Sequence, residues 1–246
     1  MTTDERGISD LVAFVLTFGI IILSVSTVYM LGFDSLEEVR DDEQIRSVDR
    51  TMEGISETLA DIHRENSPSR SVAVGLDGGA ISVVEESQLT VVIETPNKTV
   101  NRSVDVGAIV LTPNDNAEMV YEGGIAYRTQ GDGQFVLSDP VISCDGRTAI
   151  VDIAKVTGQL SVSIPGTIEL SGRHTSERSL YPAAGQLRNN ATAVEIKIDD
   201  TRNPDAWRQY FETSADGWTE TSDGYRCSGL EAVSVQATTI SIDAVY

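Results

Sequence analysis

Two histidines and two cysteines are the residues best suited to catalysis or metal binding in this chain of 246 residues. His63 and His174 have no second histidine four residues away and no nucleophile motif beside them. Cys144 and Cys227 lack the close spacing of metal ligands. The sequence therefore predicts a protein that is not an enzyme and that carries no cofactor or metal.

A polar stretch, TPNDNAE, offers side-chain oxygens that suit a calcium ion. They belong to Asn114, Asp115, Asn116 and Glu118. Their spacing matches no complete calcium-loop motif, because such a loop alternates its ligands over twelve residues. We therefore expect a solvated turn here.

An aromatic group follows a helix-start signal near the C-terminus. Asn203 and the proline after it are typical of an N-cap and a first helical position. Trp207, Tyr210 and Phe211 then share one helical face. That face suits either a ligand platform or packing against a sheet, and we expect packing.

The cysteines and three asparagine triplets are relevant to whether their domain lies outside the cell. Cys144 and Cys227 can form a disulfide if their domain is extracellular, and two buried thiols are the alternative. Asn97, Asn101 and Asn190 each begin an Asn-x-Ser/Thr triplet that N-glycosylation would use on an extracellular loop. Unmodified loop asparagines remain the alternative for each triplet.

The composition is strongly acidic. Asp and Glu number 38 against 18 Lys and Arg, which gives a net charge of -20. This charge excludes nucleic acid as a partner, because the phosphate backbone is itself anionic. The acidic residues are dispersed through patterned segments, as on a folded protein in concentrated salt, so a halophilic source is our interpretation. An ordinary acidic protein is the alternative.

The first structural element expected along the chain is an apolar run near the N-terminus. Leu11 to Phe33 contains no charged residue, and as a helix it covers roughly 34 Å, enough to cross a bilayer. The leader MTTDERG is not basic and no small-residue cleavage site follows the run, so a conventional secretory signal does not fit. The sequence predicts one membrane pass.

An amphipathic helix is expected directly after this run, over residues 34–66. One apolar stripe recurs at spacings of three and four residues, and polar residues occupy the other face. The stripe consists of Ile45, Val48, Met52, Ile55, Leu59 and Ile62. Pro68 ends the pattern. We expect the stripe to pack on the chain's own domain, and an intersubunit surface is the alternative.

The remaining segment, residues 67–246, reads as a β-rich head. Short Val- and Ile-rich segments alternate in polarity and are separated by Gly, Asn, Asp and Pro clusters. The predicted fold class is mainly β with a long N-terminal helix. Its head is a β-sandwich-like domain of about ten strands with one short helix.

The order of these parts resembles archaeal type IV pilins and pilin-like proteins with class III signal peptides. The resemblance lies in Arg6 followed by Gly7, Ile8 and "SD", and then in the apolar helix, its amphipathic continuation and the β-rich head. It implies a leader at residues 1–7, a membrane or filament-core helix at 8–33, and cleavage by a prepilin peptidase between Gly7 and Ile8.

The resemblance further implies a single-pass protein of the cell membrane with an extracellular C-terminal domain. Its expected partners are membrane lipid, the prepilin peptidase and other pilin subunits that contact its N-terminal helix. The expected function is that of a minor subunit in a filament for adhesion or surface interaction. The alternative is a permanently anchored extracellular β-domain, a binding or envelope protein, that does not polymerise.

Overall fold

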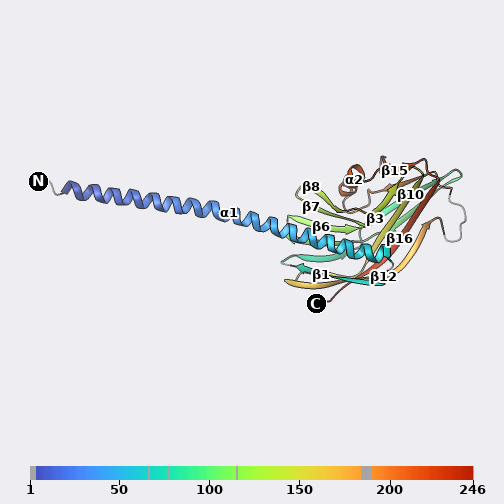
Figure 1. Cartoon of the computed structure of the whole chain (residues 1–246), viewed down its shortest axis with the longest axis horizontal. Coiled ribbons are helices and arrows are strands. Elements are labelled where there is room, and N and C mark those ends of the chain that lie inside the picture. The colour runs from blue at the N-terminus through green and yellow to red at the C-terminus, as the bar shows by residue number, and fades with distance from the viewer. Residues whose placement is uncertain (1–3, 66, 77, 115, 184–189, 246) are drawn as a thin grey trace. The chain divides into compact units, whose positions relative to one another are not determined.

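The computed structural model describes residues 4–65, 67–76, 78–114, 116–183 and 190–245. These residues form a long helix, α1 (Asp4–Glu65), sixteen strands, and a short helix, α2 (Pro204–Thr213) (Figure 1). The chain divides into two compact units, and the boundary falls within α1, between Arg46 and Ser47. The fold class is mainly β with a long N-terminal helix, as the sequence predicts.

The first unit contains the apolar part of α1. Leu11–Met30 is long and apolar enough to cross a membrane, and it is exposed in the isolated chain. The hydroxyls of Thr17, Ser24 and Thr27 donate hydrogen bonds to backbone carbonyls four residues earlier. These bonds satisfy the polar side chains inside the helix, which lowers the cost of placing it among apolar neighbours.

The second unit is the head, and its strands form three sheets. The first sheet pairs all its neighbours antiparallel except β10 and β16, which are parallel. In spatial order it contains β1 (Ser69–Leu76), β12 (Gly166–Tyr181), β16 (Ala232–Val245), β10 (Thr148–Thr157) and β9 (Val141–Cys144).

The other two sheets are antiparallel throughout. The second sheet contains, in spatial order, β11 (Ser161–Val162), β2 (Ala80–Val84), β5 (Ala108–Asn114), β6 (Ala117–Glu122), β7 (Ile125–Gln130) and β8 (Gly133–Ser138). The third contains β14 (Thr219–Glu220), β15 (Gly224–Ser228), β13 (Ala193–Lys197), β3 (Gln88–Thr95) and β4 (Lys98–Asp105).

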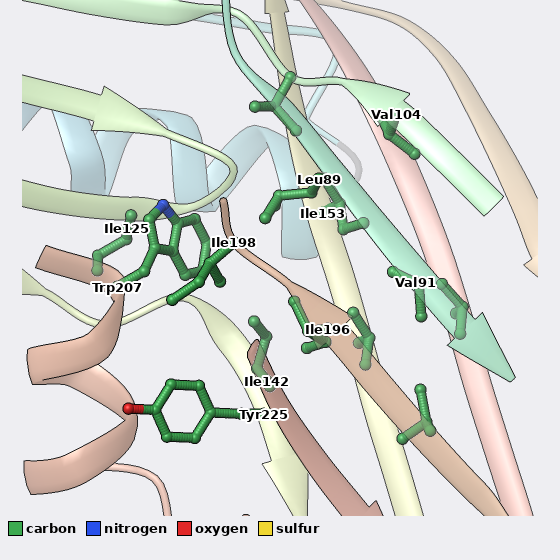
Figure 2. Close-up of a cluster of buried hydrophobic side chains, with 14 of the residues drawn as sticks. Leu89, Val91, Val104, Ile125, Ile142, Ile153, Ile196, Ile198, Trp207 and Tyr225 are labelled. Carbon is green, nitrogen blue, oxygen red and sulfur yellow. The ribbon is translucent and has the colours of Figure 1, made fainter. Parts of the chain in front are cut away.

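One hydrophobic core joins the three sheets to α2 (Figure 2). In β3 the alternate residues Leu89, Val91 and Ile93 are buried, which is the period-two pattern of a strand with one face in a core. Trp207 and Tyr225 add buried aromatic surface from α2 and β15. The expected packing role of the α2 aromatic face is therefore what the structure shows.

The C-terminal part of α1 belongs to the head. Its stripe residues Met52, Ile55 and Ile62 are fully buried. A Cβ atom added at Gly172 of β12 would lie 2.8 Å from Cδ1 of Ile62 and 3.0 Å from Cδ2 of Leu59. The glycine therefore lets the helix approach the first sheet more closely than a side chain at this position would allow.

Three polar contacts fix the position of this helix along the sheets. Asp49 forms an ion pair with Arg128 of β7. The hydroxyl of Ser56 donates a 2.9 Å hydrogen bond to that of Ser138, the last residue of β8. Nε2 of His63 lies 2.9 Å from Oδ2 of Asp152 in β10. The helix thus contacts strands of both the first and the second sheet.

The longest strand of the head, β12, departs over much of its length from the Val- and Ile-rich alternation from which we predicted the strands. Its residues from His174 to Ser179 are polar and mostly exposed, so they lack the apolar alternation that marks a strand. Backbone pairing with β16 nevertheless keeps this segment extended, while β1 pairs only with the earlier part of β12, from Gly166 to Arg173. The described residues of the head form sixteen strands, where we expected about ten.

Cys144 and Cys227 form a disulfide. Cys144 ends β9 of the first sheet and Cys227 lies in β15 of the third, so the bond ties two sheets together across a sequence separation of 83 residues. Of the two possibilities that the sequence leaves open, a disulfide and two buried thiols, the structure shows the disulfide.

Replacing Ile55 with Asp tests the burial of the stripe. We expect the free energy of unfolding to fall by about 4 kcal/mol or more, because an unpaired charge would enter the core. Ser47→Asp is the matched control, since it adds the same charge at an exposed position of the same helix. Denaturant unfolding measures both, and equal small losses in the two variants would contradict the packing described here.

Replacing Cys144 and Cys227 together with Ala tests the contribution of the disulfide. The chain-entropy model predicts a loss of about 4 to 5 kcal/mol for a closed loop of this length. The measurement is the denaturant midpoint of the double variant against the oxidised wild type, with reduced wild type as a second comparison. A double variant as stable as the oxidised protein would show that the bond does not restrict the unfolded chain.

Candidate functional site

The N-terminal segment carries the residues that we linked to processing and membrane insertion. Gly7, Ile8, Leu11 and Phe33 all lie within α1, which runs without interruption from Asp4 to Glu65. The structure therefore places the expected cleavage position in the helix that also contributes Met52 and Ile62 to the head.

The three asparagines of the glycosylation triplets are exposed. Asn97 lies in the tight turn between β3 and β4, Asn101 lies in β4, and Asn190 lies shortly before β13. β4 is an outer strand of the third sheet, so Asn101 is not enclosed by a further strand. Each site is sterically accessible to modification.

The residues first considered for catalysis or metal binding do not assemble into such a site. His63 is buried beside Asp152, and His174 lies at a register irregularity in β12. In TPNDNAE, Asp115 lies outside the described residues and Glu118 is paired with Arg202. Among the residues that the structure describes, no three His, Cys, Asp or Glu side chains gather to hold a metal ion.

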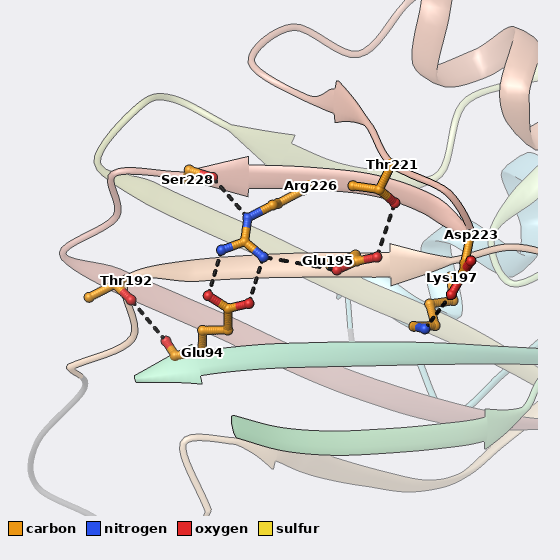
Figure 3. A network of polar contacts seen from close by, with 8 residues as sticks. All are labelled: Glu94, Thr192, Glu195, Lys197, Thr221, Asp223, Arg226 and Ser228. Carbon is orange, nitrogen blue, oxygen red and sulfur yellow. Dashed lines mark hydrogen bonds and ion pairs between the residues drawn. The ribbon is translucent and has the colours of Figure 1, made fainter. Parts of the chain in front are cut away.

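The third sheet carries an ion-pair network on its exposed face (Figure 3). The guanidinium of Arg226 in β15 donates two hydrogen bonds to the carboxylate of Glu94 in β3 and lies 4.0 Å from Glu195 in β13. The bonds from Arg226 lower the pKa of Glu94. Lys197 and Asp223 form a second pair at 2.7 Å. The network joins adjacent strands side by side.

A buried carboxylate, Glu122, lies at the centre of a different polar network. Glu122 is the last residue of β6 and is completely buried. It accepts hydrogen bonds from the Ser87 hydroxyl at 2.6 Å and from Nε1 of Trp207 at 2.8 Å. The backbone N–H of Arg202 donates a further bond at 3.3 Å. Three donors from distant segments thus converge on one carboxylate.

A two-residue glycine turn holds this network together. Gly123 and Gly124 join β6 to β7 with φ angles of 61° and 107°, a left-handed backbone that suits glycine and a tight hairpin. A Cβ atom added at Gly123 would lie 3.0 Å from Cζ2 of Trp207. The absence of a side chain lets the Trp207 ring pack against the turn, directly beside Glu122.

Burial and hydrogen bonding act on Glu122 in opposite directions. Burial raises the pKa of its carboxyl group, and the bonds from Ser87, Trp207 and Arg202 lower it. Burial is the larger effect, so the net pKa of Glu122 is raised. Glu122 could not be recognised from sequence, because a glutamate at the end of a strand is usually a solvated residue. The Gly-Gly pair after it was the available signal for a tight hairpin.

A hollow of about 420 Å³ opens beside this network. The ion pair between Arg202 and Glu118 forms part of its wall, with Nε and an Nη of the guanidinium 3.0 and 3.1 Å from the two carboxylate oxygens. Ser87 and Tyr127, which both lie next to Glu122, also line it. The candidate site of the head is therefore a polar hollow built on a buried polar network.

Comparison with known families matches residues 6–243 to a family of unknown function, DUF7289. Comparison with curated proteins and with solved structures gives no match.

The raised pKa of Glu122 predicts a specific pH dependence of stability. The folded chain holds the Glu122 proton more tightly than the unfolded chain, so this group stabilises the fold most below the ordinary glutamate pKa. Its contribution decreases as the pH rises through the raised pKa. Relative to Glu122→Gln, which cannot titrate, the wild type should lose free energy of unfolding over this range.

Urea unfolding of both proteins at several pH values and constant salt measures this difference. Glu94→Gln is the control, because the pKa of Glu94 is lowered and its contribution has the opposite sign. If the wild type instead becomes more stable relative to Glu122→Gln as the pH rises, the result would contradict the raised pKa.

Proposed function

The chain belongs to DUF7289, a family of unknown function, and we propose that it is a pilin-like cell-surface subunit. In this proposal it is a minor component of a type IV pilus-like filament that serves adhesion or surface interaction, and it has no enzymatic activity. The head is extracellular, and the chain is processed between Gly7 and Ile8.

One observation carries the proposal: a single helix, α1, has two chemically different parts. Leu11–Met30 is apolar and exposed, and it requires either lipid or other apolar helices around it. The stripe residues from Val48 to Ile62 are buried in the head. A segment of this kind suits a membrane anchor that can later pack against the same segment of other subunits.

Other features agree with an extracellular head. A disulfide between Cys144 and Cys227 is typical of an oxidising compartment. The exposed positions of Asn97, Asn101 and Asn190 suit N-glycosylation. The net charge of -20 suits a surface exposed to concentrated salt, which agrees with a halophilic source.

The permanently anchored β-domain is the competing proposal, since Leu11–Met30 alone has the length and composition to span a membrane. The two proposals differ at the N-terminus. A filament subunit begins at Ile8 after processing, and a permanent anchor keeps the residues before it.

Gly7→Leu tests the processing step. We expect the variant to remain full length, because a cleavage pocket that accepts glycine would exclude a bulky side chain. Gly19→Leu is the matched control, since it makes the same change in the same helix at a site with no atom within 4 Å of the new Cβ. Intact-mass measurement of protein from native membranes gives the N-terminus of each.

The proposal expects the wild type and Gly19→Leu to begin at Ile8 and Gly7→Leu to retain its leader. A wild-type protein that begins at Met1 or Thr2 would overturn it in favour of the permanent anchor.

A further inference from the structure

The polar hollow beside Glu122 continues into a second one. The second hollow has a volume of about 440 Å³, and Glu118 and Thr129 line both. These two residues are cross-strand partners in β6 and β7, so their side chains project from the same face of the second sheet. The two hollows therefore meet along one wall, and we call them together the β6–β7 groove. Each is within the range of about 300–1,000 Å³ that is typical of small-molecule sites.

The lining of the β6–β7 groove contains both hydrogen-bond donors and hydrogen-bond acceptors, and few charged groups. Arg202 is its one cation among the described lining residues, and Glu118 already pairs with it. Glu86 is a second carboxylate. The neutral polar side chains are those of Ser87, Thr112, Asn116, Thr129, Gln130 and Asn203. Hydroxyl and amide groups therefore outnumber charged groups along the groove.

This lining disfavours two common classes of ligand. A phosphate or sulfate would meet the carboxylates of Glu86 and Glu118 with one guanidinium to offset them. A metal ion would require a gathering of His, Cys, Asp or Glu ligands, and among the described residues no such group of three exists. A neutral ligand that can both donate and accept hydrogen bonds fits the groove better.

The wall of the groove is held in place before any ligand arrives. The backbone N–H of Arg202 donates to Oγ of Ser87 at 3.2 Å and to Oε2 of Glu122 at 3.3 Å. Both acceptor side chains are buried, so they anchor the segment whose guanidinium lines the groove. Glu118 in turn holds that guanidinium through two hydrogen bonds. Preorganised polar groups lose little conformational entropy on binding, which favours recognition of a small polar ligand.

We propose that the β6–β7 groove binds a neutral saccharide. Each sugar hydroxyl both donates and accepts a hydrogen bond, which matches a wall that contains guanidinium and amide donors together with carboxylate and hydroxyl acceptors. Arg202 and Glu118 would contact sugar hydroxyls through what their mutual pair leaves over, which is the remaining guanidinium N–H groups and a second lone pair on each carboxylate oxygen. Binding of a saccharide does not depend on the proposed surface function. Only the role of that binding in adhesion rests on it.

Saturation-transfer NMR on the full-length protein in lipid nanodiscs, free of glycoside detergents, tests the binding. The probes are the methyl glycosides of glucose, galactose, mannose and N-acetylglucosamine, together with maltose and cellobiose. We expect at least one to bind, and its affinity to fall by about tenfold or more in Arg202→Gln, which removes a charged hydrogen-bond donor. Thr129→Gln, which places a longer side chain at the middle of the groove, should reduce binding similarly.

Arg147→Gln is the matched control, because it removes an arginine that pairs with Glu231 at 2.6 Å away from the groove. Unfolding curves establish that each variant is folded. Binding of no probe, or binding that Arg202→Gln and Thr129→Gln leave unchanged, would overturn the inference. So would Arg202-dependent binding of inorganic phosphate in place of any sugar.

These outcomes are separate from those of the processing test. A chain that begins at Ile8 and binds no sugar overturns the saccharide site and leaves the filament proposal intact. A chain that keeps its leader and binds sugar through Arg202 supports the saccharide site and counts against the filament.

Discussion

The burial of one face of α1 against the head is the interaction on which the rest of the structure depends. Met52, Ile55 and Ile62 are fully buried, and Gly172 allows the helix to approach the first sheet. Contacts with β7, β8 and β10 fix its position. Without this helix, the surfaces of the first and second sheets that it covers would be exposed, so the helix that carries the apolar segment is also a structural part of the head.

Electrostatics adds a second constraint, because cations are scarce. The chain has 18 Lys and Arg against 38 Asp and Glu, so the basic side chains are too few to pair with every carboxylate. Arg226 joins β15 to β3, and Arg202 holds Glu118 at the groove wall. The pairs that join strands are partly exposed, so salt weakens them together with the repulsion between the remaining carboxylates. The stability of the fold therefore rests mainly on its apolar core and its disulfide.

Much of this architecture could be predicted from sequence, for reasons that particular residues make clear. The stripe from Val48 to Ile62 follows the helical period because one face of the helix is buried, and β3 alternates because one of its faces is buried. β12 could not be predicted in the same way, since pairing with β16 holds its polar residues from His174 to Ser179 extended without apolar alternation. The network at Glu122 was also hidden, because Ser87, Glu122 and Trp207 lie far apart in sequence and only the fold brings them together. Sequence alone did not show whether Cys144 and Cys227 pair, because their spacing is compatible with a disulfide and with two separate thiols.

Native-state hydrogen exchange of the full-length protein tests the central claim, that the C-terminal part of α1 is an integral part of the head's core. If the claim is correct, the amides from Met52 to Ile62 exchange only when the whole head unfolds, with the same free energy of opening as the central strands β12 and β16. Exchange of these helix amides through a local opening several kcal/mol below that of β12 and β16 would contradict it, because the helix would then leave the sheets while the head stayed folded.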